Sequence, residues 1–112
     1  MADRRHALDD TLEQLDATLR AGDRQAAMEL YLAVDAELTR YVHGEEQLLF
    51  PALDRYTSVP VTATTTMRDE HRSLRRLLDA LGVLIARAQE GRGLDVLSSW
   101  RSVLLLHLEK EE

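Results

Sequence analysis

The chain has 112 residues, of which 45% are hydrophobic and 30% are charged, a balance typical of one small soluble domain. Its formal net charge of −6 at pH 7 argues against nucleic acid or an anionic membrane surface as a partner. There is no cysteine, which excludes disulfides and thiolate metal sites and leaves His, Asp, Glu and Tyr as the available metal ligands.

The chain carries no sign of export or of membrane insertion. Its first residues, MADRRHALDD, are charged and lack the apolar core of a signal peptide. No apolar run approaches the roughly 18 residues that would span a bilayer. We therefore expect a cytoplasmic protein that forms a single domain over residues 1–112.

Three breaks divide the chain into four segments of helical composition. The breaks are AGD at 21–23, the β-branched stretch TSVPVTATTT at 57–66 and GRG at 91–93. The second break ends on Thr66 and Asp69, which resemble a helix-capping box. Gly and Pro are almost confined to these breaks and to segment ends. This pattern predicts an all-α fold, an antiparallel up-down-up-down four-helix bundle.

Within each segment, apolar residues recur at spacings of three and four and define the face expected to pack in the core. The first segment shows Leu8, Leu12, Leu15 and Leu19, and its face extrapolates back to Arg5. The second shows Ala27, Tyr31, Val34, Leu38, Tyr41, Glu45 and Leu48. The third shows Met67, His71, Leu74, Leu78, Leu81, Ile85 and Ala88. The fourth shows Leu97, Trp100, Leu104, His107 and Glu111.

Four polar residues occupy these core-facing positions, namely Glu45, His71, His107 and Glu111. A buried carboxylate or imidazole without a partner costs several kcal/mol, so such groups need an ion, a counter-charge or hydrogen bonds. In the expected topology all four lie toward the same end of the bundle. The sequence therefore predicts one buried polar cluster there, and paired Glu and His residues in a bundle core are typical of metal sites.

The stretch RYVHGEEQLLFP at 40–51 contains a further histidine, His43, which falls on the polar face of its helix. At about 100° per residue it lies roughly 200° from Tyr41 and Glu45, so we expect it to be exposed. Tyr41 precedes Glu45 by one helical turn, and a phenolate is a hard oxygen ligand for ferric iron. Tyr41, rather than His43, is the candidate ligand in this stretch.

Each of these residues also has an ordinary structural explanation. His71 could be a hydrogen-bonded core histidine, and His107 with Glu111 could be a simple pair one turn apart. Glu45 could pair with Arg68 or Arg72, and Tyr41 could be a core tyrosine with its hydroxyl near the surface. The coincidence of four such residues at one level favours a metal site over these explanations.

Three segments resemble the hemerythrin-like family of HHE cation-binding domains: GEEQLLFPAL at 44–53, MRDEHRSLRRLLDAL at 67–81 and WRSVLLLHLEKEE at 100–112. The resemblance implies a four-helix bundle around a non-haem di-iron site. It also implies that Glu45 and Glu111 bridge the metals and that His71 and His107 are terminal ligands. The chain departs from the family pattern at Tyr41, where the family has His. Helix 1 has Arg5 where His is expected, with His6 one residue away, so His6 is a further candidate ligand.

These observations predict a non-haem iron protein that handles O₂, peroxide or nitric oxide. If it is an enzyme, the expected chemistry is redox on a small oxidant such as peroxide. The alternatives are a non-enzymatic sensor or store of iron, oxygen or nitric oxide, and a metal-free helical interaction module. A single iron, or zinc bound by Glu45, His71, His107 and Glu111, is also compatible with the residues. The sequence leaves the oligomeric state open.

Overall fold

The structure is a computed structural model that describes the backbone of residues 2–55 and 61–111, and the side chains of residues 7–55, 64–89 and 91–108. Within these ranges every element is helical, which confirms the all-α prediction. The elements are α1 (Ala2–Ala21), α2 (Arg24–Gly44), a π-helical segment η1 (Glu45–Leu49), α3 (Phe50–Asp54), α4 (Val61–Ala86) and α5 (Glu90–Glu111). No helix in this part of the chain carries an apolar stretch that would cross a lipid bilayer.

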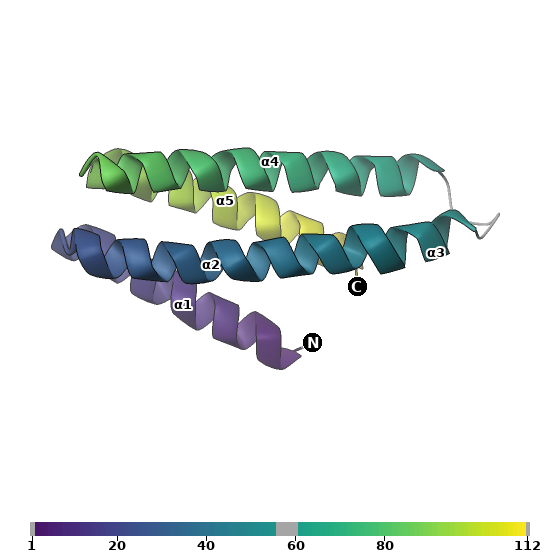
Figure 1. The fold of residues 1–112 in the computed structure, drawn as a ribbon, viewed down its shortest axis with the longest axis horizontal. Helices are drawn as coiled ribbons and strands as arrows, with labels where there is room; N and C mark the ends of the chain where they lie inside the picture. The colour runs from purple at the N-terminus through teal and green to yellow at the C-terminus, as the bar shows by residue number, and fades with distance from the viewer. Residues whose placement is uncertain (1, 56–60, 112) are drawn as a thin grey trace.

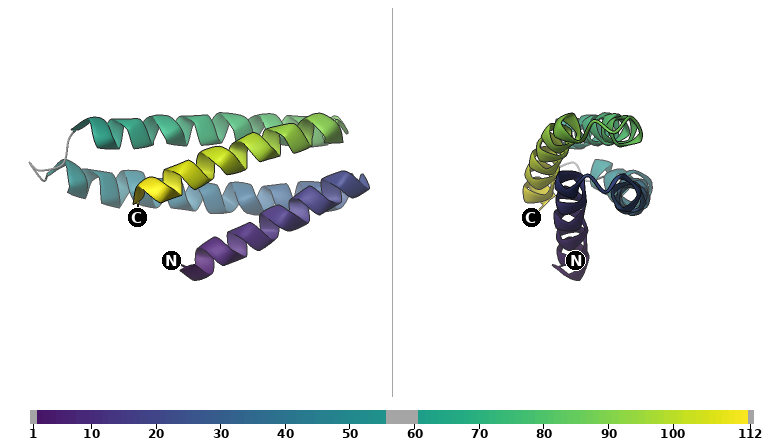
Figure 2. Two further views of the ribbon diagram at one scale, coloured as in Figure 1. Left: turned by 180° about the vertical axis from the view of Figure 1, so that it is seen from behind. Right: turned by 90° about the vertical axis from the view of Figure 1, so that its left-hand side faces the viewer.

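The four long helices pack around one core (Figure 1). Helix α1 packs against α2 and α5, and α4 packs against the same two helices, so the contacts close a ring. Toward its first residues α1 diverges from the other long helices, as both views in Figure 2 show. The short helix α3 continues the line of α2 beyond the level at which α5 ends (Figure 1).

Buried leucines at the predicted spacings form most of the core, because these spacings place them on the face of each helix that packs against the other helices. The buried apolar residues are Leu12, Leu15, Leu19, Ala27, Val34, Leu38, Phe50, Leu74, Leu78, Leu81, Ile85, Leu97, Trp100 and Leu104. Each fully buried large side chain contributes about 1.5–3 kcal/mol of transfer free energy. The indole N–H of Trp100 donates to the Leu74 carbonyl at 2.9 Å, so this large side chain is buried with its polar atom satisfied.

The turn between α1 and α2 lies where the AGD break predicted it. Gly22 adopts a positive φ of 73°. The N–H of Gly22 donates to Leu19 O at 3.2 Å and that of Asp23 donates to Thr18 O at 2.9 Å, a Schellman motif. The Asp23 carboxylate accepts a hydrogen bond from the Ala26 N–H at 3.2 Å and caps α2.

The turn between α4 and α5 lies before the GRG sequence. The predicted break at residues 91–93 is therefore wrong. Helix α4 ends at Ala86 and α5 begins at Glu90, so residues 91–93 are helical. The residue with positive φ is Ala88, at 56°, where the predicted helical face also ends. Gln89 donates to Leu84 O at 2.9 Å and Ala88 to Ile85 O at 3.0 Å, the same motif as at Gly22. A helical glycine costs only about 1 kcal/mol, which packing outweighs here.

The connection before α4 is shorter than the sequence predicted, because residues 61–66 belong to α4. Thr66 and Asp69 therefore lie inside the helix and do not cap its start. Buried Thr64 donates to Oδ1 of Asp54, the last residue of α3, at 2.7 Å, so its hydroxyl has a partner in another helix. Residues 57–60 of the expected connection lie outside the described residues.

The π-helical segment η1 changes which residues face the core after Glu45. The Phe50 N–H donates to the Glu45 carbonyl five residues earlier. On an α-helix, residues five apart point in directions about 140° apart, whereas here Glu45 and Phe50 are both buried. The predicted core position Leu48 is wrong, since that side chain is 76% exposed. The extra residue in the π turn moves the inward position from 48 or 49 to Phe50.

Candidate metal centre

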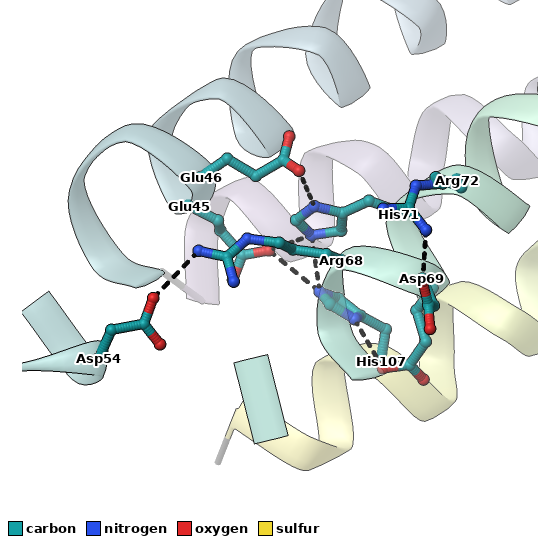
Figure 3. Close-up of polar contacts among 9 residues, drawn as sticks. Glu45, Glu46, Asp54, Arg68, Asp69, His71, Arg72 and His107 are labelled. Atoms are coloured by element: carbon teal, nitrogen blue, oxygen red, sulfur yellow. Dashed lines mark hydrogen bonds and ion pairs between the residues drawn. The ribbon is translucent and has the colours of Figure 1, made fainter. Parts of the chain in front are cut away.

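Glu45, His71 and His107 meet in the bundle core from three different helical elements (Figure 3). Glu45 begins η1, His71 lies in the first half of α4, and His107 lies near the end of α5. All three are buried, and His107 is 0% exposed. Glu45 Oε1 lies 2.7 Å from His71 Nε2 and 3.0 Å from His107 Nε2. The two Nε2 atoms are 3.3 Å apart.

These three residues can each offer one ligand atom, and the three atoms lie within 4.8 Å of one another. Two imidazoles and one carboxylate are the donor set of non-haem iron sites, and the same set also suits zinc. Three such electron-rich atoms in close contact need a proton or a cation between them. The donor chemistry and the convergence of the three side chains therefore fit a divalent metal ion.

Two further carboxylates face the outer nitrogens of the histidines. Glu70 Oε1 lies 3.2 Å from His107 Nδ1, and Glu46 Oε1 lies 3.8 Å from His71 Nδ1. The sequence reasoning missed both because neither falls on a core-facing position. The available signal was adjacency, since Glu46 follows Glu45 and Glu70 precedes His71 in the chain.

Phe50 forms one wall of the cluster and was also missed. Its ring stacks on His71 with centroids 5.3 Å apart and an interplanar angle of 20°. The Arg68 guanidinium lies over the Phe50 ring, 5.1 Å from its centroid, and its Nη2 is 3.3 Å from Asp54 Oδ2. The Phe50 ring therefore covers one face of His71, and Arg68 lies against Phe50.

The arginines proposed as partners of Glu45 pair elsewhere. Arg68 contacts Asp54 and Arg72 contacts Asp69 (Figure 3), whereas Glu45 contacts the two histidines. Neither Arg68 nor Arg72 is therefore the partner of Glu45. The hydrogen bond from Thr64, reinforced by Arg68, lowers the pKa of the Asp54 carboxyl below its usual value.

Tyr41 lies next to the cluster, one turn before Glu45. Its half-buried ring stands edge-on to both histidines, with centroids 6.3 Å from His71 and 6.0 Å from His107. Ligation by its hydroxyl stays a prediction. His43 is exposed, as its position on the polar face predicted. The side chains of His6 and Glu111 lie outside the described residues.

A groove of about 390 Å³ runs between α1 and α5, and none of the three converging donors lines it. Its floor includes Leu12, Leu97 and Leu104. His107 itself does not face the groove, although its neighbour Leu108 does. The groove therefore does not open onto the three donor residues.

An all-helical chain with buried imidazoles and a carboxylate in its core has the architecture of a helical cation-binding protein. The family model described as Hemerythrin HHE cation binding domain matches residues 3–112. The chain belongs to this family, whose members bind metal cations. No curated protein and no solved structure matches the chain.

Proposed function

We propose that this protein binds iron at Glu45, His71 and His107 and handles a small oxidant there, namely O₂, peroxide or nitric oxide. The single observation that carries the proposal is the convergence of three buried donor atoms from three elements, all within 4.8 Å. Membership of a cation-binding family supports it independently. We also propose that the helices form the antiparallel up-down-up-down bundle expected from the sequence. The proposed location of the protein is the cytoplasm.

The donor set favours iron because two histidines and one carboxylate leave coordination positions open. An iron ion held there supplies redox chemistry and an open position for a small oxygen or nitrogen ligand. The residues of this chain hold the ion and limit water around it. Phe50 covers one face of His71, and Leu74 and Leu104 are buried one turn away on the helices that carry His71 and His107.

A di-iron site needs more ligands than these three residues supply. Tyr41, Glu111 and His6 are the candidates for the additional positions, and we propose Tyr41 as the one already beside the cluster. A phenolate ligand would favour ferric iron and weaken reversible O₂ carriage. Without the additional ligands, one metal per chain is the expected occupancy.

Elemental analysis of untagged protein produced with added iron tests the proposal. About one iron per chain supports the three-residue site, and about two supports a di-iron site completed by the additional candidates. Zinc in place of iron would retain the site and overturn the redox function. Rapid peroxide consumption by the iron-loaded protein indicates an enzyme, whereas tight nitric oxide or O₂ binding without turnover indicates a sensor or store.

One observation favours the metal-free interaction module. The buried cluster already makes internal hydrogen bonds, at 2.7 Å between Glu45 and His71 and at 3.2 Å between His107 and Glu70. Hydrogen bonds of this kind can stabilise buried polar side chains without a cation. A melting temperature that changes neither with chelator nor with added iron would support the metal-free interaction module.

A further inference from the structure

The two histidines of the cluster have different outer surroundings, although their inner surroundings are nearly the same. Both present Nε2 to Glu45 Oε1, and both turn Nδ1 toward a second carboxylate. For His107 that carboxylate is Glu70, at the hydrogen-bonding distance of 3.2 Å. For His71 it is Glu46, at 3.8 Å, beyond a hydrogen bond. The His71 Nδ1 makes no hydrogen bond within the described part of the chain.

The inner contacts do not distinguish the two rings. Glu45 Oε1 lies 2.7 Å from His71 Nε2 and 3.0 Å from His107 Nε2, so either ring can donate to it. The two Nε2 atoms are 3.3 Å apart because both approach this one oxygen. The difference between the two histidines therefore lies at Nδ1.

An outer carboxylate fixes the proton on one ring. A carboxylate only accepts hydrogen bonds, so Glu70 holds a proton on His107 Nδ1. A metal ion would then be bound by His107 through Nε2, the nitrogen that faces Glu45 and His71. The Nδ1 of His71 makes no such hydrogen bond among the described residues.

We propose that Glu70 is a positioning residue that holds a proton on His107 Nδ1 and so directs Nε2 of this ring at the metal, whereas His71 has no hydrogen bond of this kind in the part of the chain that the structure describes. The metal role of this arrangement rests on the proposed function. The carboxylate nearest to His71 Nδ1 is that of Glu46, at 3.8 Å. Glu70 is the better placed of the two carboxylates, since its side chain is 16% exposed against 36% for Glu46.

Nitrogen-15 NMR of the histidine rings in metal-free protein tests the tautomers directly. We expect a protonated Nδ1 in His107. Glu70→Met removes the acceptor and keeps the length of the side chain, and should abolish the Nδ1–H form of His107. Glu70→Gln retains an acceptor oxygen and should preserve that form. Asp69→Asn removes the neighbouring carboxylate, which pairs with Arg72, and should leave both rings unchanged.

Zn(II) affinity, measured by competition with a chromophoric chelator, tests the metal role. Loss of an outer-shell partner of a ligating histidine typically lowers metal affinity about 10–100-fold. We expect a loss in this range for Glu70→Met, a smaller loss for Glu70→Gln and for Glu46→Gln, and none for Asp69→Asn. In the Zn(II)-bound protein both rings should carry their protons on Nδ1.

Two outcomes would overturn the inference. One is an Nε2–H tautomer of His107 in the metal-free wild-type protein. The other is a Glu70→Met variant with unchanged tautomers and unchanged Zn(II) affinity. A different outcome bears on the proposed function instead. If the wild-type protein bound neither Zn(II) nor Fe(II) while His107 showed the expected tautomer, the metal site would be refuted and the Glu70 hydrogen bond would stand.

Discussion

The two ends of the bundle bury different kinds of side chain. At the end with the Gly22 and Ala88 turns, the core is apolar, with Leu19 and Leu81 both near Gly93. At the end formed by η1, the buried groups are a carboxylate and two imidazoles. The buried side chains at the first end are stabilised by apolar packing. The second depends on hydrogen bonds or a bound cation, so its stability should respond to metal and that of the first should not.

The largest expected effect belongs to the apolar end. Leu81 is fully buried, and Leu81→Ala should lower the free energy of unfolding by about 2–5 kcal/mol through lost burial and a new cavity. Urea denaturation with and without bound iron measures this loss. The loss should be the same in both states, and a loss that depended on metal would break the distinction between the two ends.

His107→Ala addresses the polar end. With ligand at 100 times its Kd, binding stabilises the folded protein by about 2.7 kcal/mol. We expect that increment to vanish in His107→Ala, because one of three ligands is gone, and thermal denaturation with and without Fe(II) under anaerobic conditions measures it. His43→Ala is the matched control on the exposed face of α2 and should retain the full increment. Loss of the increment in the control would refute the assignment of the site.

Tyr41→Phe should have a smaller effect. Removal of a phenolate ligand should lower ferric iron affinity by roughly tenfold, about 1.4 kcal/mol, while the ring keeps its packing against both histidines. The visible absorption of the ferric protein should change with it. An unchanged ferric spectrum would remove Tyr41 from the ligands and leave it as a packing residue.

The smallest effect concerns the two turns at the apolar end, which share one motif but differ in residue. The Cβ atom of Ala88 makes its φ of 56° sterically strained, whereas Gly22, which has no Cβ, adopts φ 73° without this strain. After allowance for the entropy of the unfolded chain, Ala88→Gly should stabilise the protein by about 0.5–1 kcal/mol, and Gly22→Ala should destabilise it by a similar amount. Urea midpoints compare the two variants, and a destabilised Ala88→Gly would contradict the shared motif.

Most of the fold could be predicted from the sequence because leucine spacing determines which helix face is buried. The same spacing placed Glu45, His71 and His107 in the core, and the structure brings these three together. Where chain reversal depends on backbone geometry, composition was misleading. GRG looks like a break, yet Ala88 supplies the positive φ, and the threonines of 64–66 are helical.

The parts of the site that could not be predicted depend on neighbours in space. Glu70 reaches His107 across the interface of α4 and α5, and no spacing along one helix reveals that contact. Phe50 was missed for another reason, since the predicted face assumed 3.6 residues per turn throughout. A local change in helical periodicity leaves no clear mark in the order of apolar and polar residues.

The π turn at Glu45–Leu49 also affects how this chain tolerates insertions and deletions. Deleting one of the exposed residues 47–49 would leave Phe50 four residues after Glu45, and an α-helix keeps residues four apart on one face. Phe50 would then stay beside His71, with regular α-helix in place of the π turn. A one-residue insertion in the same stretch would instead turn Phe50 about 100° further and move it away from His71. A relative with a one-residue gap there should therefore keep the same wall beside its histidines, whereas one with an added residue should not.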